Sequence, residues 1–326
     1  MSILNAVTNS HPGRATLINE DCFLTGGYVP DSFSMETSPA SIEYKMSDSS
    51  RQTVCFAVFA GNGGKMAAKV AAQIAAEQLL EEVPRLLLLP LIDVEPLMQR
   101  YGARVHDQIM SSSKLEKTLS DMGAAFACIC LRGEQAVVFN FGGCQVYQYR
   151  VGHLKKMTTD QPQQNYFGQP DRKVKITCAA SIAFPVRDND RFLICSPGLA
   201  KYVDESKIKD CLETPDLQHS ARQLISLALE RVNSESITAT VVSWSAKDLE
   251  RGPATDLSDP EKLGPAHEKI AHAVREMDKD LRQPKDKIEL PPARKFDYWQ
   301  HFPVWVGYLG LALAVLIGVL IWYSSR

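Results

Sequence analysis

The eight cysteines are the residues best suited to metal or redox chemistry, and their spacing favours neither. No two of them form a Cys-x-x-Cys pair, whereas a zinc site or a disulfide framework needs clustered cysteines. Several lie in apolar runs, as at residues 126–131. We therefore expect reduced, mostly buried thiols and a cytosolic domain. The cysteines stand at positions 22, 55, 128, 130, 144, 178, 195 and 211.

The histidines are scattered in the same way, and the sequence gives them no catalytic partner. A serine hydrolase of the Ser-His-Asp type would also carry a nucleophile-elbow motif, which is absent from the sequence. Hydrolysis through a serine triad is therefore not indicated. The isolated histidines include His11, His106, His153 and His219.

A glycine-rich turn, Gly-Asn-Gly-Gly at residues 61–64, joins an apolar run to an alanine-rich helical pattern at residues 65–83. Backbone N–H groups at a helix start can bind an anion, so Gly63 and Gly64 are candidate phosphate-binding residues. A structural role alone would also account for the turn, because glycine permits positive φ and a close approach of strand and helix.

The elements around this turn come in an order that favours an α+β layered domain. Short apolar segments bounded by glycine or polar turn residues indicate an antiparallel meander between residues 124 and 157. Further strands are predicted at residues 53–60, 191–195 and 237–244, and helices at residues 65–83, 94–112, 205–212 and 217–232.

The composition suits one globular domain with an appendage. At 326 residues and 45% hydrophobic, the chain can bury a substantial core. Its formal net charge of −2 and its pI of about 6.4 lack the basic footprint of a nucleic-acid binder, so no nucleic-acid partner is expected. Residues 1–21 contain no apolar stretch long enough for a signal peptide.

One C-terminal stretch departs from this soluble profile. It begins at Val304, ends at Tyr323 and carries no charge, and its 20 residues match the thickness of a hydrocarbon core. Aromatic residues flank it and basic residues precede it, which predicts a single-pass tail anchor with the N-terminal domain on the cytoplasmic side. The alternative is a buried core helix, which rarely lacks polar residues for so long.

The region before the anchor changes character and separates it from the globular part. Residues 246–301 are charged and rich in proline, and one charged helix is predicted near residues 266–283. The predicted organisation is therefore a globular domain at 1–245, a linker at 246–301 and a transmembrane anchor at 302–323.

Five segments of the chain match the motifs of a known family in the family's order, across residues 10–245. Together they make the chain resemble the PP2C-type, metal-dependent Ser/Thr phosphatases. The segments are Gly-Arg-Ala-Thr-Leu-Ile-Asn-Glu-Asp at 13–21, the strand and turn at 54–64, the run at 122–161 that holds Asn-Phe-Gly-Gly-Cys-Gln, Phe-Leu-Ile-Cys-Ser-Pro-Gly-Leu at 192–199, and Ser-Ile-Thr-Ala-Thr-Val-Val at 236–242.

The resemblance implies an α-β-β-α sandwich, in which two antiparallel sheets pack face to face and helices cover both outer faces. It also implies two Mn²⁺ or Mg²⁺ ions in a cleft between the sheets, held by carboxylates, and an arginine that grips the substrate phosphate. Two neighbouring cations need several carboxylates to offset their mutual repulsion.

Carried over residue by residue, the resemblance gives four candidate metal ligands. Glu20 and Asp21 keep the family's acidic pair, and Gly61 keeps the turn whose backbone carbonyl contributes to the site. Glu235, at a further acidic position, is the fourth candidate. Apart from these four, Asp160 survives in the family's Thr-x-Asp-His motif.

The remaining positions of the family's site are degenerate. Three expected aspartates are replaced by Ala60, Gly143 and Pro197, none of which offers a side-chain oxygen. The phosphate-gripping arginine falls at Thr16, and the arginine of the Gly-Asp-Ser-Arg motif falls at Gln145. Each lost ligand weakens metal binding by roughly 10–100-fold. We expect no cofactor beyond weak Mn²⁺ or Mg²⁺ binding, and no efficient two-metal hydrolysis.

The leading hypothesis is therefore a membrane-tethered PP2C-like pseudophosphatase, a cytoplasmic binding or regulatory module for a phosphoprotein, a kinase or another component of a membrane assembly. One alternative is a divergent Mn²⁺- or Mg²⁺-dependent Ser/Thr phosphatase with a single-metal or rebuilt site, for which Asp188 and Asp190 are recruitable carboxylates. The other alternative is a scaffold subunit of a membrane complex, with the helix at 266–283 as its docking element.

Overall fold

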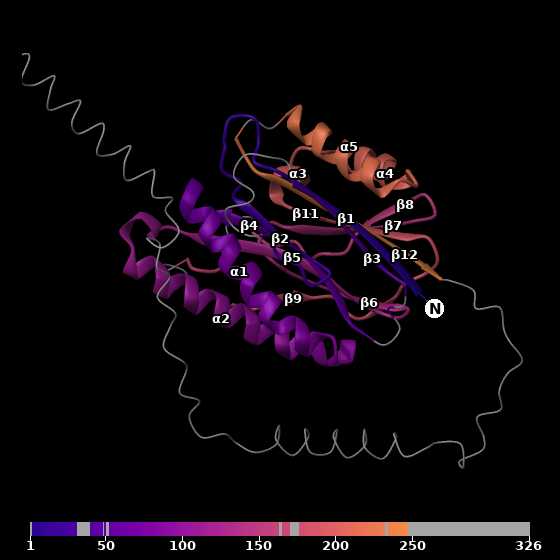
Figure 1. Cartoon of the computed structure of the whole chain (residues 1–326), viewed down its shortest axis with the longest axis horizontal. Coiled ribbons are helices and arrows are strands. Elements are labelled where there is room, and N and C mark those ends of the chain that lie inside the picture. The colour runs from indigo at the N-terminus through magenta and orange to yellow at the C-terminus, as the bar shows by residue number, and fades with distance from the viewer. Residues whose placement is uncertain are drawn as a thin grey trace, which may run out of the picture. The chain divides into compact units, whose positions relative to one another are not determined.

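The structure is a computed structural model, and its described residues all lie within one compact unit, Met1–Gly252 (Figure 1). The linker helix predicted near residues 266–283 and the anchor predicted at 302–323 lie outside the described residues. Within the described part of the chain, no helix is both long and apolar enough to cross a membrane. The described residues are 2–30, 40–47, 49, 52–162, 165–169, 176–231 and 234–246.

Two antiparallel sheets form the centre of this unit. The first sheet has the strand order β3 (Ala40–Met46), β1 (Ser2–His11), β12 (Ile237–Ala246), β11 (Asp190–Cys195), β7 (Gln145–Arg150) and β8 (His153–Lys156). The second sheet has the order β10 (Phe184–Pro185), β6 (Gln135–Phe141), β5 (Gly123–Arg132), β4 (Val54–Asn62) and β2 (Asp21–Thr25), and β9 (Ala179–Ala180) also pairs with β6.

Helices cover the outer face of each sheet, as Figure 1 shows. The second sheet is covered by α1 (Lys65–Leu86) and α2 (Val94–Leu115), and the first sheet by α4 (Glu205–Glu213) and α5 (Leu217–Leu229). Short connecting helices are η1 (Leu91–Asp93), η2 (Lys117–Leu119) and α3 (Pro197–Ala200). The layering confirms the α-β-β-α sandwich that the resemblance implies.

Small residues on one face of α1 allow it to lie close to the second sheet. Ala68, Ala71, Ala72, Ala75 and Ala76 are fully buried, since a methyl group needs little room between helix and strand. The neighbouring helix is tied to it, because the Tyr101 hydroxyl of α2 donates a hydrogen bond to the Ala75 carbonyl at 2.9 Å.

The space between the two sheets is filled mainly by large apolar side chains. Phe23, Phe56, Phe192 and Trp244 all belong to this inter-sheet core. Burying one such side chain stabilises the fold by roughly 1.5–3 kcal/mol. Two further apolar clusters lie between each sheet and its helices.

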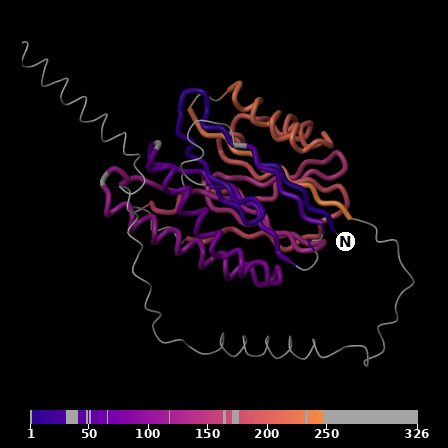
Figure 2. Tube along the Cα trace, in the orientation of Figure 1, coloured from indigo at the N-terminus to yellow at the C-terminus, as the bar shows by residue number. Residues whose placement is uncertain are grey.

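The first and last strands of the domain lie side by side in the middle of the first sheet, where Figure 2 shows indigo β1 against orange β12. Their register pairs Thr8 with Thr240 and Ser10 with Thr238. The strands β5 to β8 were predicted from the sequence, but the single meander expected for them is wrong, because β5 and β6 pair in the second sheet and β7 and β8 pair in the first. The strands β1, β2 and β3 were not predicted. β1 was missed because its buried residues include hydroxyl and amide side chains rather than an apolar run.

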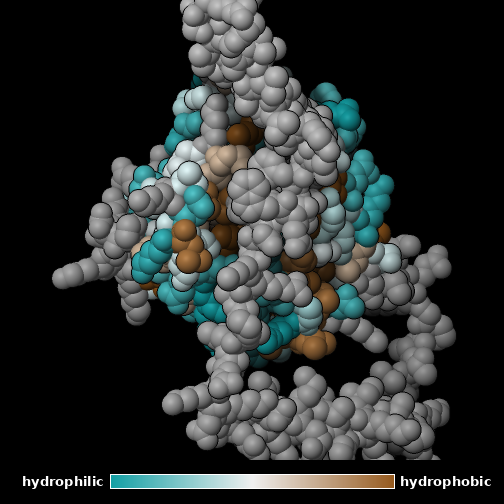
Figure 3. Space-filling view, turned by 60° about the vertical axis from the view of Figure 1, so that its left-hand side comes forward, coloured by the Kyte–Doolittle hydropathy of each residue, from teal (hydrophilic) through white to brown (hydrophobic). Residues whose placement is uncertain are grey.

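The large exposed hydrophobic residues of the described surface lie on separate elements, and Figure 3 shows hydrophobic side chains between hydrophilic ones on one face. Ile92, Leu115 and Ile182, for example, lie on η1, α2 and the segment after β9. Single exposed apolar residues are normal on a soluble domain, so they do not mark an interface by themselves.

Candidate metal site

The carboxyl group of Asp21 lies at one end of the inter-sheet space, surrounded by hydroxyl groups. Asp21 begins β2 and stands opposite Ala60 of β4 in the sheet. Thr238 of β12 donates its hydroxyl to Asp21 Oδ2 at 2.8 Å, and the Ser196 hydroxyl bonds the same carboxyl. We call the place where Asp21, Ala60, Ser196 and Thr238 meet the Asp21 site.

The hydroxyl groups continue from this site into a seam that joins the two sheets. Ser10 Oγ lies 2.7 Å from Thr238 Oγ1, and Asn19 donates its amide to Ser10 Oγ at 2.8 Å. Farther along, Thr8 Oγ1 lies 2.7 Å from Thr25 Oγ1 and 2.9 Å from Thr240 Oγ1. All these side chains are buried. The hydroxyl seam consists of Thr8, Ser10, Thr25, Thr238 and Thr240.

The surroundings of Asp21 favour its protonated form. Burial raises the pKa of the Asp21 carboxyl to about 7, although the hydrogen bonds from Ser196 and Thr238 act against that rise. The neighbouring charges of Glu20 and Glu235 raise the pKa further. A carboxyl group must lose its proton before it can bind a metal ion, so this environment opposes metal binding.

The turn at residues 61–64 is fixed by close backbone contacts. A Cβ atom on Gly61 would lie 2.0 Å from the Ala68 carbonyl oxygen, and one on Gly63 would lie 2.1 Å from the Asp121 carbonyl oxygen. Gly63 and Gly64 also have positive φ, of 111° and 88°. These contacts confirm the structural role of the glycines, and their predicted binding of phosphate stays a prediction.

The three positions at which the resemblance implies an aspartate carry residues that pack against their neighbours. Ala60 belongs to the inter-sheet core. Gly143 lies in the β6–β7 turn, followed by the buried Cys144. Pro197 is the first residue of α3, a position where proline suits a helix start. None of them offers a side-chain oxygen to a cation.

The two glutamates among the candidate ligands, Glu20 and Glu235, make contacts with other protein groups. Glu235 forms an ion pair with Lys201 at 3.5 Å and accepts a hydrogen bond from the Tyr202 hydroxyl at 3.2 Å. Glu20 is half-buried, and its backbone N–H donates to Ser236 Oγ at 2.8 Å. The Glu20 carbonyl accepts from the Gly61 N–H at 3.1 Å, which ties the predicted acidic pair to the glycine turn.

The substituted arginine positions and the surviving aspartate have local partners. Thr16 bonds both the N–H and the carbonyl of Ile18, at 3.2 and 3.3 Å. Gln145 accepts a hydrogen bond from the Tyr147 hydroxyl. Asp160 is 84% exposed and pairs with Lys156, so its carboxylate serves a surface ion pair.

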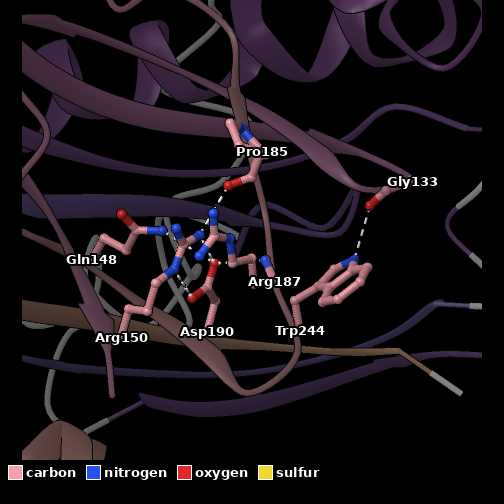
Figure 4. Close-up of polar contacts among 7 residues, drawn as sticks. All are labelled: Gly133, Gln148, Arg150, Pro185, Arg187, Asp190 and Trp244. Atoms are coloured by element: carbon pink, nitrogen blue, oxygen red, sulfur yellow. Dashed lines mark hydrogen bonds and ion pairs between the residues drawn. The ribbon is translucent and has the colours of Figure 1, made fainter. Parts of the chain in front are cut away.

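The proposal that Asp188 and Asp190 rebuild the site is wrong. Figure 4 shows the Asp190 carboxylate enclosed by Gln148, Arg150 and the backbone of Arg187. Asp190 pairs in register with Trp244, six residues along β12 from Thr238. At the strand rise this places it about 20 Å from the Asp21 site. Asp188 also lies at that far end, where it accepts from the Ala246 N–H at 3.0 Å.

The described residues do not fit a two-metal centre. Within the ranges that the structure describes, no three His, Cys, Asp or Glu side chains are grouped so as to hold a metal ion. The donor set at the Asp21 site is mostly hydroxyl, and hydroxyl groups do not supply the negative charge that two divalent cations need.

Sequence reasoning missed the hydroxyl seam and Tyr166. The seam had a weak signal, because Thr238 and Thr240 are two residues apart and so share one face of a strand. Their partners in β1 come from the opposite end of the domain, and only the register of the two strands identifies them. Tyr166 stands in no family motif, and its place beside the Asp21 site is known only from the fold.

Known phosphatases share both sequence and fold with this chain, although no family model matches it. The Ser/Thr protein phosphatase PstP of Mycobacterium tuberculosis is 26% identical over 207 residues, which are 56% of this chain and 38% of that protein. The Ser/Thr phosphatase stp of Listeria welshimeri is 22% identical over 204 residues, 56% of this chain and 81% of that protein. The match thus spans about two fifths of the mycobacterial relative.

Solved structures agree with this likeness at the level of the fold. The catalytic domain of PstP in complex with two manganese ions superposes with a TM-score of 0.59 at 20% identity, covering 76% of this chain and all of that one. PppA, a regulatory component of the type VI secretion system of Pseudomonas aeruginosa, gives a TM-score of 0.57 at 23% identity, covering 74% of this chain and 99% of that one.

Proposed function

We propose that this chain, whose described domain has the fold of the PP2C-type Ser/Thr phosphatases, is a pseudophosphatase that acts as a binding or regulatory module. One observation supports it above the others. Asp21 is kept, but its carboxyl faces the hydroxyls of Ser196 and Thr238 in place of further carboxylates.

The charge at the site supports an inactive centre. Ala60, Gly143 and Pro197 remove three carboxylates, and each lost ligand weakens metal binding by roughly 10–100-fold. Glu235 has Lys201 as a cationic partner, and a bound cation would have to replace that ion pair. Two divalent cations held close together would therefore repel each other with too little negative charge to offset them.

We propose that the domain acts at a membrane surface. The uncharged stretch at residues 304–323 is long enough to span a bilayer, and the basic residues before it favour a cytoplasmic domain. Tethering raises the effective concentration of the domain toward partners in the same membrane. We propose a protein partner there, such as a phosphoprotein or a kinase, whose recognition needs no hydrolysis.

A divergent phosphatase with one metal ion is the second candidate, and the retained Glu20, Asp21 and Glu235 favour it. The PstP catalytic domain, which shares the fold, is described in complex with two manganese ions. This candidate requires Mn²⁺-dependent turnover that Glu20→Ala abolishes.

Hydrolysis by the full chain in detergent micelles separates the two candidates. The substrates are an aryl phosphate and a phosphothreonine peptide, each with Mn²⁺, Mg²⁺ or EDTA. We expect no turnover above that of Glu20→Ala in any condition. Mn²⁺-dependent turnover that is lost in Glu20→Ala would establish an enzyme and refute the pseudophosphatase.

A gain-of-ligand variant provides the matched positive control. Ala60→Asp, Gly143→Asp and Pro197→Asp together restore the three missing carboxylates. Turnover by this triple variant, with none by the natural chain, would assign the inactivity to those three positions.

A further inference from the structure

A short segment, residues 165–169, is anchored beside the Asp21 site by a buried aromatic side chain. Phe167 is fully buried and stacks against Phe141 and Phe126, with ring centroids 4.5 and 5.7 Å away. Its backbone exchanges two hydrogen bonds with Ala124 of β5, at 2.8 and 3.2 Å. The segment is therefore held as firmly as a strand of the sheet.

Close contacts on both sides of Phe167 leave the segment little room to shift. The Gly168 N–H donates to His106 Nδ1 of α2 at 3.0 Å, and a Cβ on Gly168 would lie 2.1 Å from Ile109 Cγ2. On the other side, a Cβ on Gly142 would lie 2.3 Å from the Asn165 carbonyl oxygen. The residue between these contacts, Tyr166, thus has a fixed backbone position.

The Tyr166 side chain packs at the inter-sheet core beside β5, where a Cβ atom on Gly123 would lie 2.8 Å from Tyr166 Cβ. It is half-buried and packs against the inter-sheet core that contains Ala60 and Cys144. Burial raises the pKa of its phenol, and the neighbouring Cys144, Glu235 and Asp21 raise it further. The ring therefore packs against the core that contains Ala60 and Cys144, and its phenol lies within electrostatic range of Asp21 and Glu235.

The replacements at the site leave room that a side chain has to fill. Ala60 and Gly143 are much smaller than the aspartates they replace, and protein interiors tolerate few empty cavities, because each lost contact costs stability. Tyr166 packs against the core that contains Ala60, so its ring is available to fill that volume.

We infer that Tyr166 is an internal plug, which closes the former metal site of this domain and shields Cys144 from solvent. The inference rests on the proposed function and deepens it, because a plugged site presents a closed surface to a partner instead of an open cleft. A partner then binds over Tyr166, and phosphate has no path to Asp21.

Thiol alkylation of the full chain tests the plug directly. The reporter is Cys144, which is 1% exposed. The internal control is Cys128, which is fully buried on the helix-covered face of β5. The chain is treated with iodoacetamide under native conditions, and the labelled cysteines are identified by mass spectrometry. We expect Cys144 to stay unlabelled in the natural chain and in Tyr166→Phe, which keeps the ring. In Tyr166→Ala, its alkylation rate should rise by an order of magnitude or more, while Cys128 stays unlabelled.

Two results would overturn the plug: labelling of Cys144 in the natural chain, or equal protection of Cys144 in Tyr166→Ala. If Cys128 also reacts in Tyr166→Ala, the variant has unfolded, and Tyr166→Leu, which retains more volume, replaces it with the same expected order of rates. Turnover with Mn²⁺ would refute the proposed function whatever the labelling shows. A natural chain in which Cys144 is labelled but which shows no turnover would refute the plug alone.

Discussion

Asp21 and Asp190 are both buried aspartates at the start of a strand, but they lie at opposite ends of the sandwich and their carboxyl groups have different partners. Asp190 has the Arg150 guanidinium, whose Nε lies 2.6 Å from Asp190 Oδ1, together with the Gln148 amide. Among the described residues, the donors to the Asp21 carboxyl are hydroxyl groups, from Ser196 and Thr238.

The difference shows what each carboxylate is for. The buried Asp190 carboxylate, bound in bidentate fashion by the Arg150 guanidinium, has a structural role, because its charge is neutralised inside the protein. The Asp21 carboxyl has hydroxyl donors in place of a cation among the described contacts. Protonation is therefore the less costly way to bury it. The Asp190 end therefore keeps a charge, and the Asp21 end tends to lose one.

The largest expected effect is at the Asp190 end. Arg150→Ala leaves the buried Asp190 charge without its cation and should lower the free energy of unfolding by roughly 3–5 kcal/mol. Urea unfolding followed by tryptophan fluorescence measures it. Arg150→Lys keeps the charge but not the two-pronged geometry, so its loss should be smaller. Equal losses in both variants would show that geometry, and not charge, holds this end.

The next largest effect is a pH dependence of the free energy of unfolding that comes from Asp21. The pKa of Asp21 is about 7 in the folded chain, against about 4 when unfolded. The folded state therefore holds a proton that the unfolded state has already released, so this contribution to stability is present in acid and is lost as pH rises toward 7. Asp21→Asn removes it.

Urea unfolding of the natural chain and of Asp21→Asn across that pH range measures the difference. The stability of the natural chain relative to the variant should fall by at most about 4 kcal/mol between pH 4 and pH 8. A difference that stays flat, or that rises with pH, would mean that the folded chain holds Asp21 ionised, as a metal ligand would be.

The hydroxyl seam should show a smaller effect that depends on which partner the hydroxyl serves. Thr238→Val removes the donor to Asp21 and should cost about 1–3 kcal/mol, since it leaves a buried carboxyl less satisfied. Thr240→Val is the matched control, because the Thr240 hydroxyl bonds only the neutral Thr8 hydroxyl among the described contacts. Its expected cost is about 0.5–1.5 kcal/mol. A larger loss in Thr240→Val would contradict the special place of Asp21.

The smallest effect concerns two residues with positive φ, which lie next to Arg150 and Asp190 in the chain. Val151, next to Arg150, has φ of 45°, and Asn189, next to Asp190, has φ of 66°. A branched side chain is strained there, so Val151→Asn should stabilise the chain by about 1 kcal/mol. Asn189→Val should destabilise it by a similar amount. Thermal unfolding measures both, and two changes of the same sign would refute the strain.

Much of the fold and part of the site could be predicted from the sequence. The structural role of Gly61 is one example, because a tight turn from strand to helix favours residues without a Cβ atom, and the contact with the Ala68 carbonyl confirms it. The strands β5 to β8 and the pairings β5–β6 and β7–β8 also followed from local patterns, because paired strands are neighbours along the chain, whereas the step from one sheet to the other between β6 and β7 did not. That Ala60, Gly143 and Pro197 stand where the family has aspartates followed from the collinear motifs alone, and the loss of a metal site there stays a prediction.

The rest depends on contacts between distant residues. Ser10 and Thr238 are 228 positions apart, so no local pattern pairs their hydroxyls. Asp190 looked recruitable because a loop was expected before the strand at Arg191, yet Asp190 begins β11 and the strand register places it at the other end of the sandwich. Tyr166 follows a polar stretch, and its position is set by the burial of its neighbour Phe167.

Calorimetric titration of the full chain with Mn²⁺ at neutral pH tests most directly whether the Asp21 site has ceased to be a metal centre. The Ala60→Asp, Gly143→Asp, Pro197→Asp triple variant is titrated in parallel as the chain with its carboxylates restored. A site of hydroxyls around an Asp21 with a raised pKa predicts no saturable heat from the natural chain at millimolar Mn²⁺. Saturable binding to the natural chain that Asp21→Asn abolishes would show that a working metal site persists.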